Sequence, residues 1–279
     1  MSFIKSTAVA SALALATAST SFAKDTLYIV NSGSKGGSYN GQLTALSAGL
    51  NTKYDIEYVQ AKGCKKTVSI LKKLSSEGAS AISLYSSSSS GFKKECTFMR
   101  PTIKNYLFAN VKAGIIFSHK DVKNNFLNNG NTIGISSELD KIINEIGQKN
   151  NISFKTVRYK NAKSVTLGVL NKEVDFGISN NSKRFWKNID KLNGHFVLFD
   201  NSLEGIPSLK KLGVAPGPSL DVYIYFGTNR EKLISDIKNV YTSSNSDYAK
   251  WYSGQKGMKN NIMDSVESRI SDVQAYLLP

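Results

Sequence analysis

Four short clusters rich in serine, glycine and asparagine could bind a small anion: Ser32–Tyr39, Ser86–Ser88, Ser136–Glu138 and Ser179–Asn181. Each follows an apolar run that is typical of a strand. Hydroxyls, side-chain amides and the backbone N–H groups at a helix start donate hydrogen bonds to carboxylate or phosphate, and the helix dipole adds partial positive charge. Ordinary helix capping would explain any single cluster. Four clusters at matching places favour one shared ligand.

Catalytic and metal-binding motifs find little support. The sequence has no GxSxG or HExxH motif, and GSKGGSYN lacks the ending of a phosphate-binding loop and the glycine spacing of a dinucleotide fingerprint. The sequence has only two histidines, so it offers few candidates for the general base of a Ser–His pair. We expect His195 to be structural, while His119, near a predicted hinge, could touch a ligand. No paired carboxylates stand out, and we expect no catalytic residue, metal or cofactor.

Residues 1–23 are typical of a secretory signal peptide. Lys5 supplies the positive start, Ala8–Ala18 is an alanine-rich apolar run, and Ser21–Ala23 offers small residues for cleavage. The run is shorter than the roughly 20 residues that span a bilayer, and no later segment is a better candidate. We therefore expect a mature chain that begins at Lys24 and is soluble in the periplasm or otherwise outside the cytoplasm.

The two cysteines, Cys64 and Cys96, are predicted to form a disulfide. Export favours one bridge over two free thiols. Closing a loop of about 33 residues would stabilise the fold by roughly 3–4 kcal/mol. Both histidines are far away in sequence, which disfavours a metal site at these cysteines.

The composition is that of a basic globular protein. The sequence has 36 Lys and Arg against 21 Asp and Glu, a net charge of +15, and 41% hydrophobic residues. Such charge attracts anions, which include small carboxylates, phosphate, acidic surfaces and nucleic acid. The lysines are spread among Asn and Ser without an arginine-rich stripe, so solubility alone explains them equally well.

Strands and helices alternate in two series, as they do in βαβ units. Strands are predicted at Thr26–Asn31, Ile56–Gln60, Ala79–Tyr85, Lys112–His119, Thr132–Ile135, Ile152–Tyr159, Val174–Ser179 and His195–Phe199. Helices are predicted at Gly41–Leu50, Lys65–Leu74, Leu139–Gln148 and Ala162–Leu170. This pattern predicts an α/β fold with two doubly wound lobes.

The C-terminal block holds one predicted strand, Tyr223–Phe226, and three helices, Arg230–Tyr241, Asp247–Tyr252 and Ser265–Leu277. One strand cannot build a sheet, so the block is expected to return to the first lobe. The predicted lobes are residues 24–117 with 222–279, and residues 118–221. Two hinge crossings would join them, near Phe117–Asp121 and Ser219–Tyr223.

The order of these pieces resembles the periplasmic solute-binding receptors of tripartite tricarboxylate transporters, the Bug-type receptors. The segments that carry the resemblance are IVNSGSKGGSYNGQL (Ile29–Leu43), AKGCKKTVSILKKL (Ala61–Leu74), VRYKNAKSVTLGVLNKEVDFGISN (Val157–Asn180), EGIPSLKKLG (Glu204–Gly213) and YIYFGTNREKLISDIKNV (Tyr223–Val240). Each motif is degenerate alone, and their order along nearly the whole mature chain carries the likeness. The resemblance implies the type II periplasmic-binding-protein architecture.

The resemblance also implies a small carboxylate held between two lobes by loop amides, hydroxyls and water. Carried over position by position, the expected ligand-binding residues are Ser34, Gly36, Gly37, Ser38, Tyr39, Ser86, Ser87, Ser136, Ser137 and Asn180. Tyr39 would cover the carbon skeleton of the ligand, and closure about the hinges would exclude water.

We therefore expect a monomeric, non-catalytic receptor that captures a small anionic metabolite, most simply a di- or tricarboxylate, and hands it to membrane permease subunits. No nucleic acid partner is expected. Receptors for phosphate or of the TRAP type are alternatives of the same class. A secreted enzyme on a two-lobed scaffold and a basic envelope or nucleic-acid-binding protein are alternatives of other classes.

Overall fold

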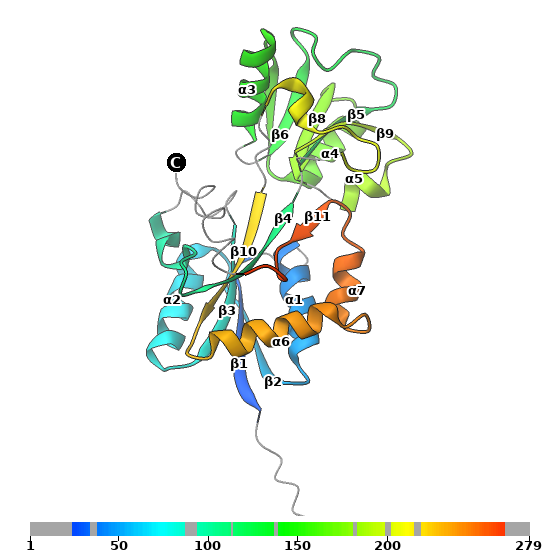
Figure 1. The fold of residues 1–279 in the computed structure, drawn as a ribbon. Helices are drawn as coiled ribbons and strands as arrows, with labels where there is room; N and C mark the ends of the chain where they lie inside the picture. The colour runs from blue at the N-terminus through cyan, green and yellow to red at the C-terminus, as the bar shows by residue number, and fades with distance from the viewer. Residues whose placement is uncertain are drawn as a thin grey trace, which may run out of the picture.

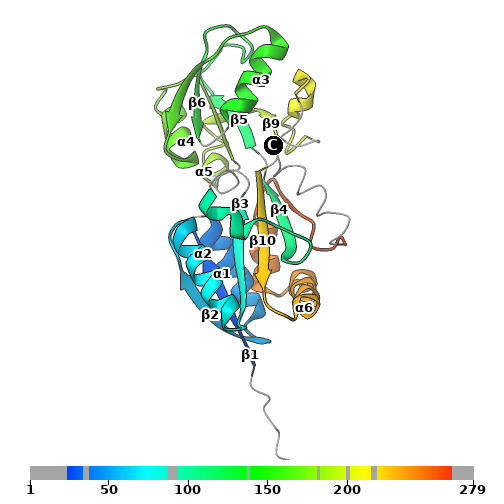
Figure 2. The same ribbon diagram turned by 90° about the vertical axis from the view of Figure 1, so that its left-hand side faces the viewer.

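Two sheets organise the chain. The computed structural model describes residues 24–33, 38–86, 94–112, 114–136, 139–180, 183–198, 202–214 and 219–265. Among these residues, one sheet has the strand order β11-β4-β10-β3-β1-β2 and the other has the order β7-β6-β8-β5-β9. Figures 1 and 2 show each sheet with its own helices, one lobe above the other. The predicted two-lobed α/β fold is confirmed.

The first lobe begins with the predicted alternation of strand and helix. Its elements are β1 (Asp25–Asn31), α1 (Ser38–Leu50), β2 (Tyr54–Gln60), α2 (Cys64–Ser76) and β3 (Ser80–Ser86). Strand β1 pairs in parallel with both β2 and β3. Because β1 and β3 are buried on both faces, they are nearly continuous apolar runs. Helix α1 covers one face of the sheet and α2 covers the other.

The chain leaves this lobe and later returns to it. The departing part is η1 (Lys94–Met99) and β4 (Tyr106–Lys112), and the returning part is β10 (Ser219–Phe226), α6 (Arg230–Thr242), α7 (Asp247–Ser253) and β11 (Met258–Asn260). Strand β10 lies antiparallel between β3 and β4, which confirms that the C-terminal block joins the first sheet. The sequence prediction missed β4 and β11.

The second lobe holds the remaining elements. They are β5 (Gly114–His119), β6 (Thr132–Ser136), α3 (Asp140–Asn150), β7 (Lys155–Tyr159), α4 (Ala162–Leu170), β8 (Phe176–Asn180), α5 (Lys183–Lys187), β9 (Leu192–Val197) and η2 (Leu209–Leu212). Strand β6 is parallel to β7 and β8, whereas β5 runs antiparallel to β8 and β9. The predicted second series of strands and helices is therefore present.

The crossings lie earlier in the chain than the sequence predicted. Phe117 is inside β5, which pairs only with strands of the second sheet, and Ser219–Tyr223 is inside β10 of the first sheet. The chain thus leaves the first sheet at Lys112 and enters the second at Gly114. The lobe bounds expected at 117/118 and 221/222 divide β5 and β10. The single strand predicted at Lys112–His119 spans the crossing, so the sequence pattern does not mark the change of sheet.

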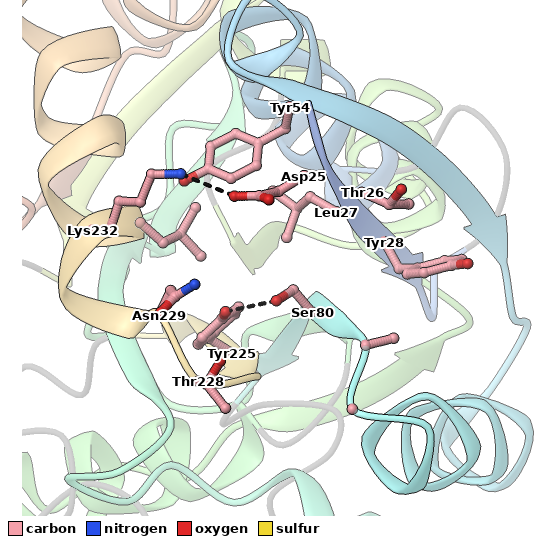
Figure 3. Close-up of a pocket in the computed structure, with 13 residues that line it drawn as sticks. Asp25, Thr26, Leu27, Tyr28, Tyr54, Ser80, Tyr225, Thr228, Asn229 and Lys232 are labelled. Carbon is pink, nitrogen blue, oxygen red and sulfur yellow. Dashed lines mark hydrogen bonds and ion pairs between the residues drawn. The ribbon is translucent and has the colours of Figure 1, made fainter. Parts of the chain in front are cut away.

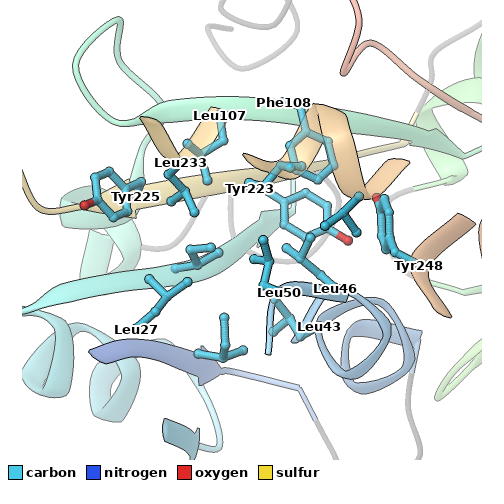
Figure 4. Close-up of a cluster of buried hydrophobic side chains, with 14 of the residues drawn as sticks. Leu27, Leu43, Leu46, Leu50, Leu107, Phe108, Tyr223, Tyr225, Leu233 and Tyr248 are labelled. Carbon is cyan, nitrogen blue, oxygen red and sulfur yellow. The ribbon is translucent and has the colours of Figure 1, made fainter. Parts of the chain in front are cut away.

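A buried cluster fixes α1 on the first sheet. Leu43, Leu46 and Leu50 of α1 are buried against the sheet, where Tyr223 stacks on Phe108 with ring centroids 4.0 Å apart (Figure 4). Full burial of one such leucine contributes about 1.5–3 kcal/mol. This packing sets where the first residues of α1 lie.

The predicted disulfide is present. Cys64 and Cys96 are bonded, with Cα atoms 5.3 Å apart, and join the start of α2 to η1. In the described ranges, no helix is both long and apolar enough for a membrane span. The predicted signal peptide at 1–23, and all but the first residue of the helix predicted at Ser265–Leu277, lie outside the described residues.

Candidate functional site

The carboxyl ends of parallel strands from both sheets lie beside the crossing. In the first sheet, Ser86 is the last residue of β3 and pairs with Asp221 of β10. Asp221 also pairs with Asn110 of β4, two residues before Lys112. In the second sheet, Gly114, two residues after Lys112, pairs with Asn180, the last residue of β8. Ligands of open α/β sheets bind at such carboxyl ends. The crossing therefore marks the candidate site.

A buried polar network occupies this edge of the first sheet, on the face that α1 covers. Gln42 Nε2 donates to Asp221 Oδ2 at 2.5 Å, and Lys112 forms a short ion pair with the same oxygen. Asn110 Nδ2 donates to Gln42 Oε1 at 2.7 Å, and the Tyr223 hydroxyl donates to that oxygen at 3.2 Å. Burial above all raises the pKa of Tyr223 well above its ordinary value, so this hydroxyl stays protonated and donates.

The two charges of the network are almost out of water. The side chain of Lys112 is 9% exposed and that of Asp221 is 2% exposed. Desolvation costs several kcal/mol for each ion, so such a pair contributes little to net stability compared with a well-packed apolar pair. Removing only one partner would leave a buried, uncompensated charge.

A second network fixes the chain on both sides of residues 34–37. Asn31 at the end of β1 is fully buried, and its Oδ1 accepts from the backbone N–H of Gly33 at 2.9 Å. Its Nδ2 donates to Asn40 Oδ1 and to Gln60 Oε1, both at 3.1 Å. Gly33 also has no room for a side chain, because a Cβ there would lie 2.9 Å from Cβ of Tyr39. Asn31 thus connects the end of β1 to the first turn of α1.

The described part of the predicted ligand set lies at this edge in both lobes. Tyr39 is in the first turn of α1, and its ring centroid is 5.5 Å from Lys112 Nζ. Ser86 and Ser136 are buried at the ends of β3 and β6. Ser38 is the first residue of α1, and Asn180 is the last residue of β8. Ser34, Gly36, Gly37, Ser87 and Ser137 lie outside the described residues, and ligand contact stays a prediction for the whole set.

The two histidines lie away from this edge. His119 is the last residue of β5, whose first residue is at the crossing, so the prediction that His119 lies at a hinge is wrong. Its Nδ1 accepts a hydrogen bond from the Asp121 backbone at 3.2 Å. His195 Nε2 is 2.8 Å from Ser118 Oγ, its ring packs edge-on against Phe176, and burial lowers its pKa. These contacts give His195 a structural role.

Sequence reasoning missed the polar side chains that form the networks. They are Asn31, Gln42, Gln60, Asn110, Lys112 and Asp221. A usable signal existed, because YLFANVK and SLDVYIYF each carry a charge within an otherwise apolar strand. A charge in a buried strand requires a partner. Which residue supplies it depends on the pairing of β4 with β10, which the sequence does not reveal.

A cavity of 360 Å³ lies at the other end of the first sheet (Figure 3). Asp25 and Ser80, the first residues of β1 and β3, line it, and Lys232 Nζ is 3.1 Å from Asp25 Oδ2. It sits at the amino ends of the parallel strands, opposite the crossing, so we do not assign it to the ligand. Across the described ranges, no three His, Cys, Asp or Glu side chains are grouped so as to hold a metal ion.

No family model and no curated protein sequence matches the chain. Solved structures do match it. A TctC solute-binding protein from Polaromonas, without ligand, has a TM-score of 0.65 and 11% identity, over 91% of this chain and 96% of that one. The periplasmic binding protein BugD has a TM-score of 0.62 and 12% identity, over 92% and 95% of the two chains.

A third solved structure is MatC from Rhodopseudomonas palustris with malate bound. It has a TM-score of 0.62 and 12% identity, and the match covers 92% of this chain and 100% of that one. Identities this low show the fold alone. This chain therefore has the two-lobed fold of TctC- and Bug-type solute-binding proteins.

Proposed function

We propose that this protein is an extracytoplasmic solute receptor that captures a small carboxylate between its lobes and delivers it to membrane permease subunits. The observation that carries the proposal is the placement of both carboxyl edges, with their buried polar groups, beside one crossing. The fold supports it, since solved proteins with this fold include one with malate and one with adipate.

In this proposal the ligand bridges the two lobes. Backbone N–H groups of residues 34–37 and the start of α1 hold the carboxylate from the first lobe, together with Ser86 and Ser87. Ser136, Ser137 and Asn180 approach it from the second lobe, and Tyr39 covers its carbon skeleton. The lobes themselves would be residues 24–112 with 219–265, and residues 114–214. Closure about the crossings removes water and strengthens each hydrogen bond.

A thermal-shift screen of the chain from Lys24 onward tests this proposal. The panel is malate, succinate, citrate, adipate, phosphate and a set of amino acids, with calorimetric titration of every compound. A ligand at 100 times its Kd adds about 2.7 kcal/mol to the free energy of unfolding. We expect a carboxylate to shift the melting temperature. If no carboxylate shifts the melt or gives heat of binding, the proposal is wrong.

A substitution in the second lobe locates the site. Ser137→Asp places a negative charge among the proposed donors and should abolish carboxylate binding without lowering the melting temperature of the free protein. Ser153→Asp, on an exposed residue near the amino end of β7, is the matched control and should bind normally. Equal affinity in both variants would show that the ligand binds elsewhere.

Amino-terminal sequencing of the secreted protein tests export. We expect the sequence to begin at Lys24.

A further inference from the structure

We propose that Lys112 recognises the negative charge of the solute, and that Asp221 holds the ammonium group of Lys112 in place. This inference rests on the proposed function and extends it, because the expected ligand set contains only hydroxyl, amide and backbone donors. Lys112 and Asp221 are the buried charges that the described residues place at the crossing.

The position of Lys112 supports this assignment. It is the last residue of β4, two residues before the first residue of the second sheet. Two residues of the expected ligand set flank its ion pair. The Tyr39 ring centroid is 5.5 Å from Lys112 Nζ, and Ser86 is the strand partner of Asp221. A carboxylate between Ser86 and Tyr39 would therefore lie beside this ammonium group.

The chemistry of the pair supports it as well. The Asp221 oxygen that meets Lys112 also accepts from Gln42, and Gln42 is held in turn by Asn110 and Tyr223. The ammonium group ends a flexible side chain and has three donors, so it can serve Asp221 and a ligand carboxylate together. The fixed aspartate thus sets where the ammonium group of Lys112 lies.

The burial of the pair argues for function over stability. An apolar pair of similar volume would be as stable or more so. The opposite charges of Lys112 and Asp221 cancel at a distance, so Lys112 attracts a ligand only when the two are in direct contact. The substrate class that follows is a solute with at least one full negative charge at this position, chosen over a neutral analogue of the same shape.

The test compares succinate with succinamate, which replaces one carboxylate by a neutral amide of nearly equal size. Calorimetric titration of the wild-type protein should favour succinate by roughly 10- to 100-fold, the range for a hydrogen bond to a charged group. The double variant Lys112→Met with Asp221→Asn removes both charges, so neither is left buried alone. The double variant should bind succinate no more than about threefold more tightly than succinamate, because the charge that recognises the carboxylate is gone.

Two controls make the outcome decisive. Lys104→Met, at an exposed lysine of the same lobe, should keep the wild-type preference. Lys112→Arg keeps the positive charge and should keep at least part of it. If the double variant folds, binds and still discriminates like the wild type, the inference is wrong while the receptor proposal stands. If the wild type binds neither succinate nor any carboxylate of the screen, both are wrong.

Discussion

Reduction of the Cys64–Cys96 disulfide is expected to destabilise the first lobe and leave the second unchanged. The cysteines are 32 positions apart, so the bond closes a loop of about 33 residues. The chain-entropy relation gives about 12.5 cal/mol/K for such a loop, or about 3.7 kcal/mol at 25 °C. For a urea slope of roughly 2 kcal/mol/M, the unfolding midpoint should fall by about 2 M.

The two tryptophans allow each lobe to be followed separately. Trp251 lies in α7 of the first lobe and Trp186 in α5 of the second. Trp186→Phe leaves Trp251 as a reporter of the first lobe, and Trp251→Phe leaves Trp186 as a reporter of the second. Urea unfolding is then followed by fluorescence with and without a phosphine reductant. We expect reductant to shift only the Trp251 transition.

The double variant Cys64→Ala with Cys96→Ala is the control, and reductant should not change its unfolding. Its midpoint should lie at or somewhat below that of the reduced protein, because Cys96 is buried and its sulfur is lost. A shift below about 1 kcal/mol in the Trp251 transition would refute the loop-closure reasoning. An equal shift in the Trp186 transition would refute the expectation that the two lobes unfold separately.

Two further predictions concern charged side chains of the first lobe. Burial opposes the charge of Asp236, but hydrogen bonds from Lys53 and Tyr54, at 2.5 and 2.7 Å, outweigh it and hold its pKa below the ordinary value. The charged Asp236 therefore stabilises the protein above the pKa of the unfolded state, and this stabilisation is lost as pH falls through the lower pKa of the folded state. Urea titrations should show that Asp236→Asn is destabilised by about 1–3 kcal/mol at pH 7 and is as stable as the wild type in acid. Lys256 Nζ is 4.9 Å from the ring centroid of Trp186 in the other lobe. Lys256→Ala should lower the free energy of unfolding by about 0.5–1 kcal/mol and increase acrylamide quenching of Trp186. Unchanged quenching would show that this contact is not kept in solution.

The sequence by itself determined the local elements of this protein. The 3.6-residue spacing of Leu43, Leu46 and Leu50 predicted α1, and the apolar run of ASAISLY predicted β3. These signals are local, because burial of one face dictates the residue types within a few positions. Two cysteines in a chain expected to be exported likewise predicted the bridge, since only one pairing was possible.

The tertiary structure alone decided which elements meet. Strand β10 enters the first sheet between β3 and β4, more than a hundred residues after β4, and only this pairing brings Asp221 to Lys112 and to Gln42. The tertiary structure also places the crossing at Lys112–Gly114, at the start of the strand predicted at Lys112–His119. Sequence patterns record which residues are buried, whereas a buried charge also needs a partner that chain topology selects from far away. The polar networks of the candidate site belong to that second kind of information.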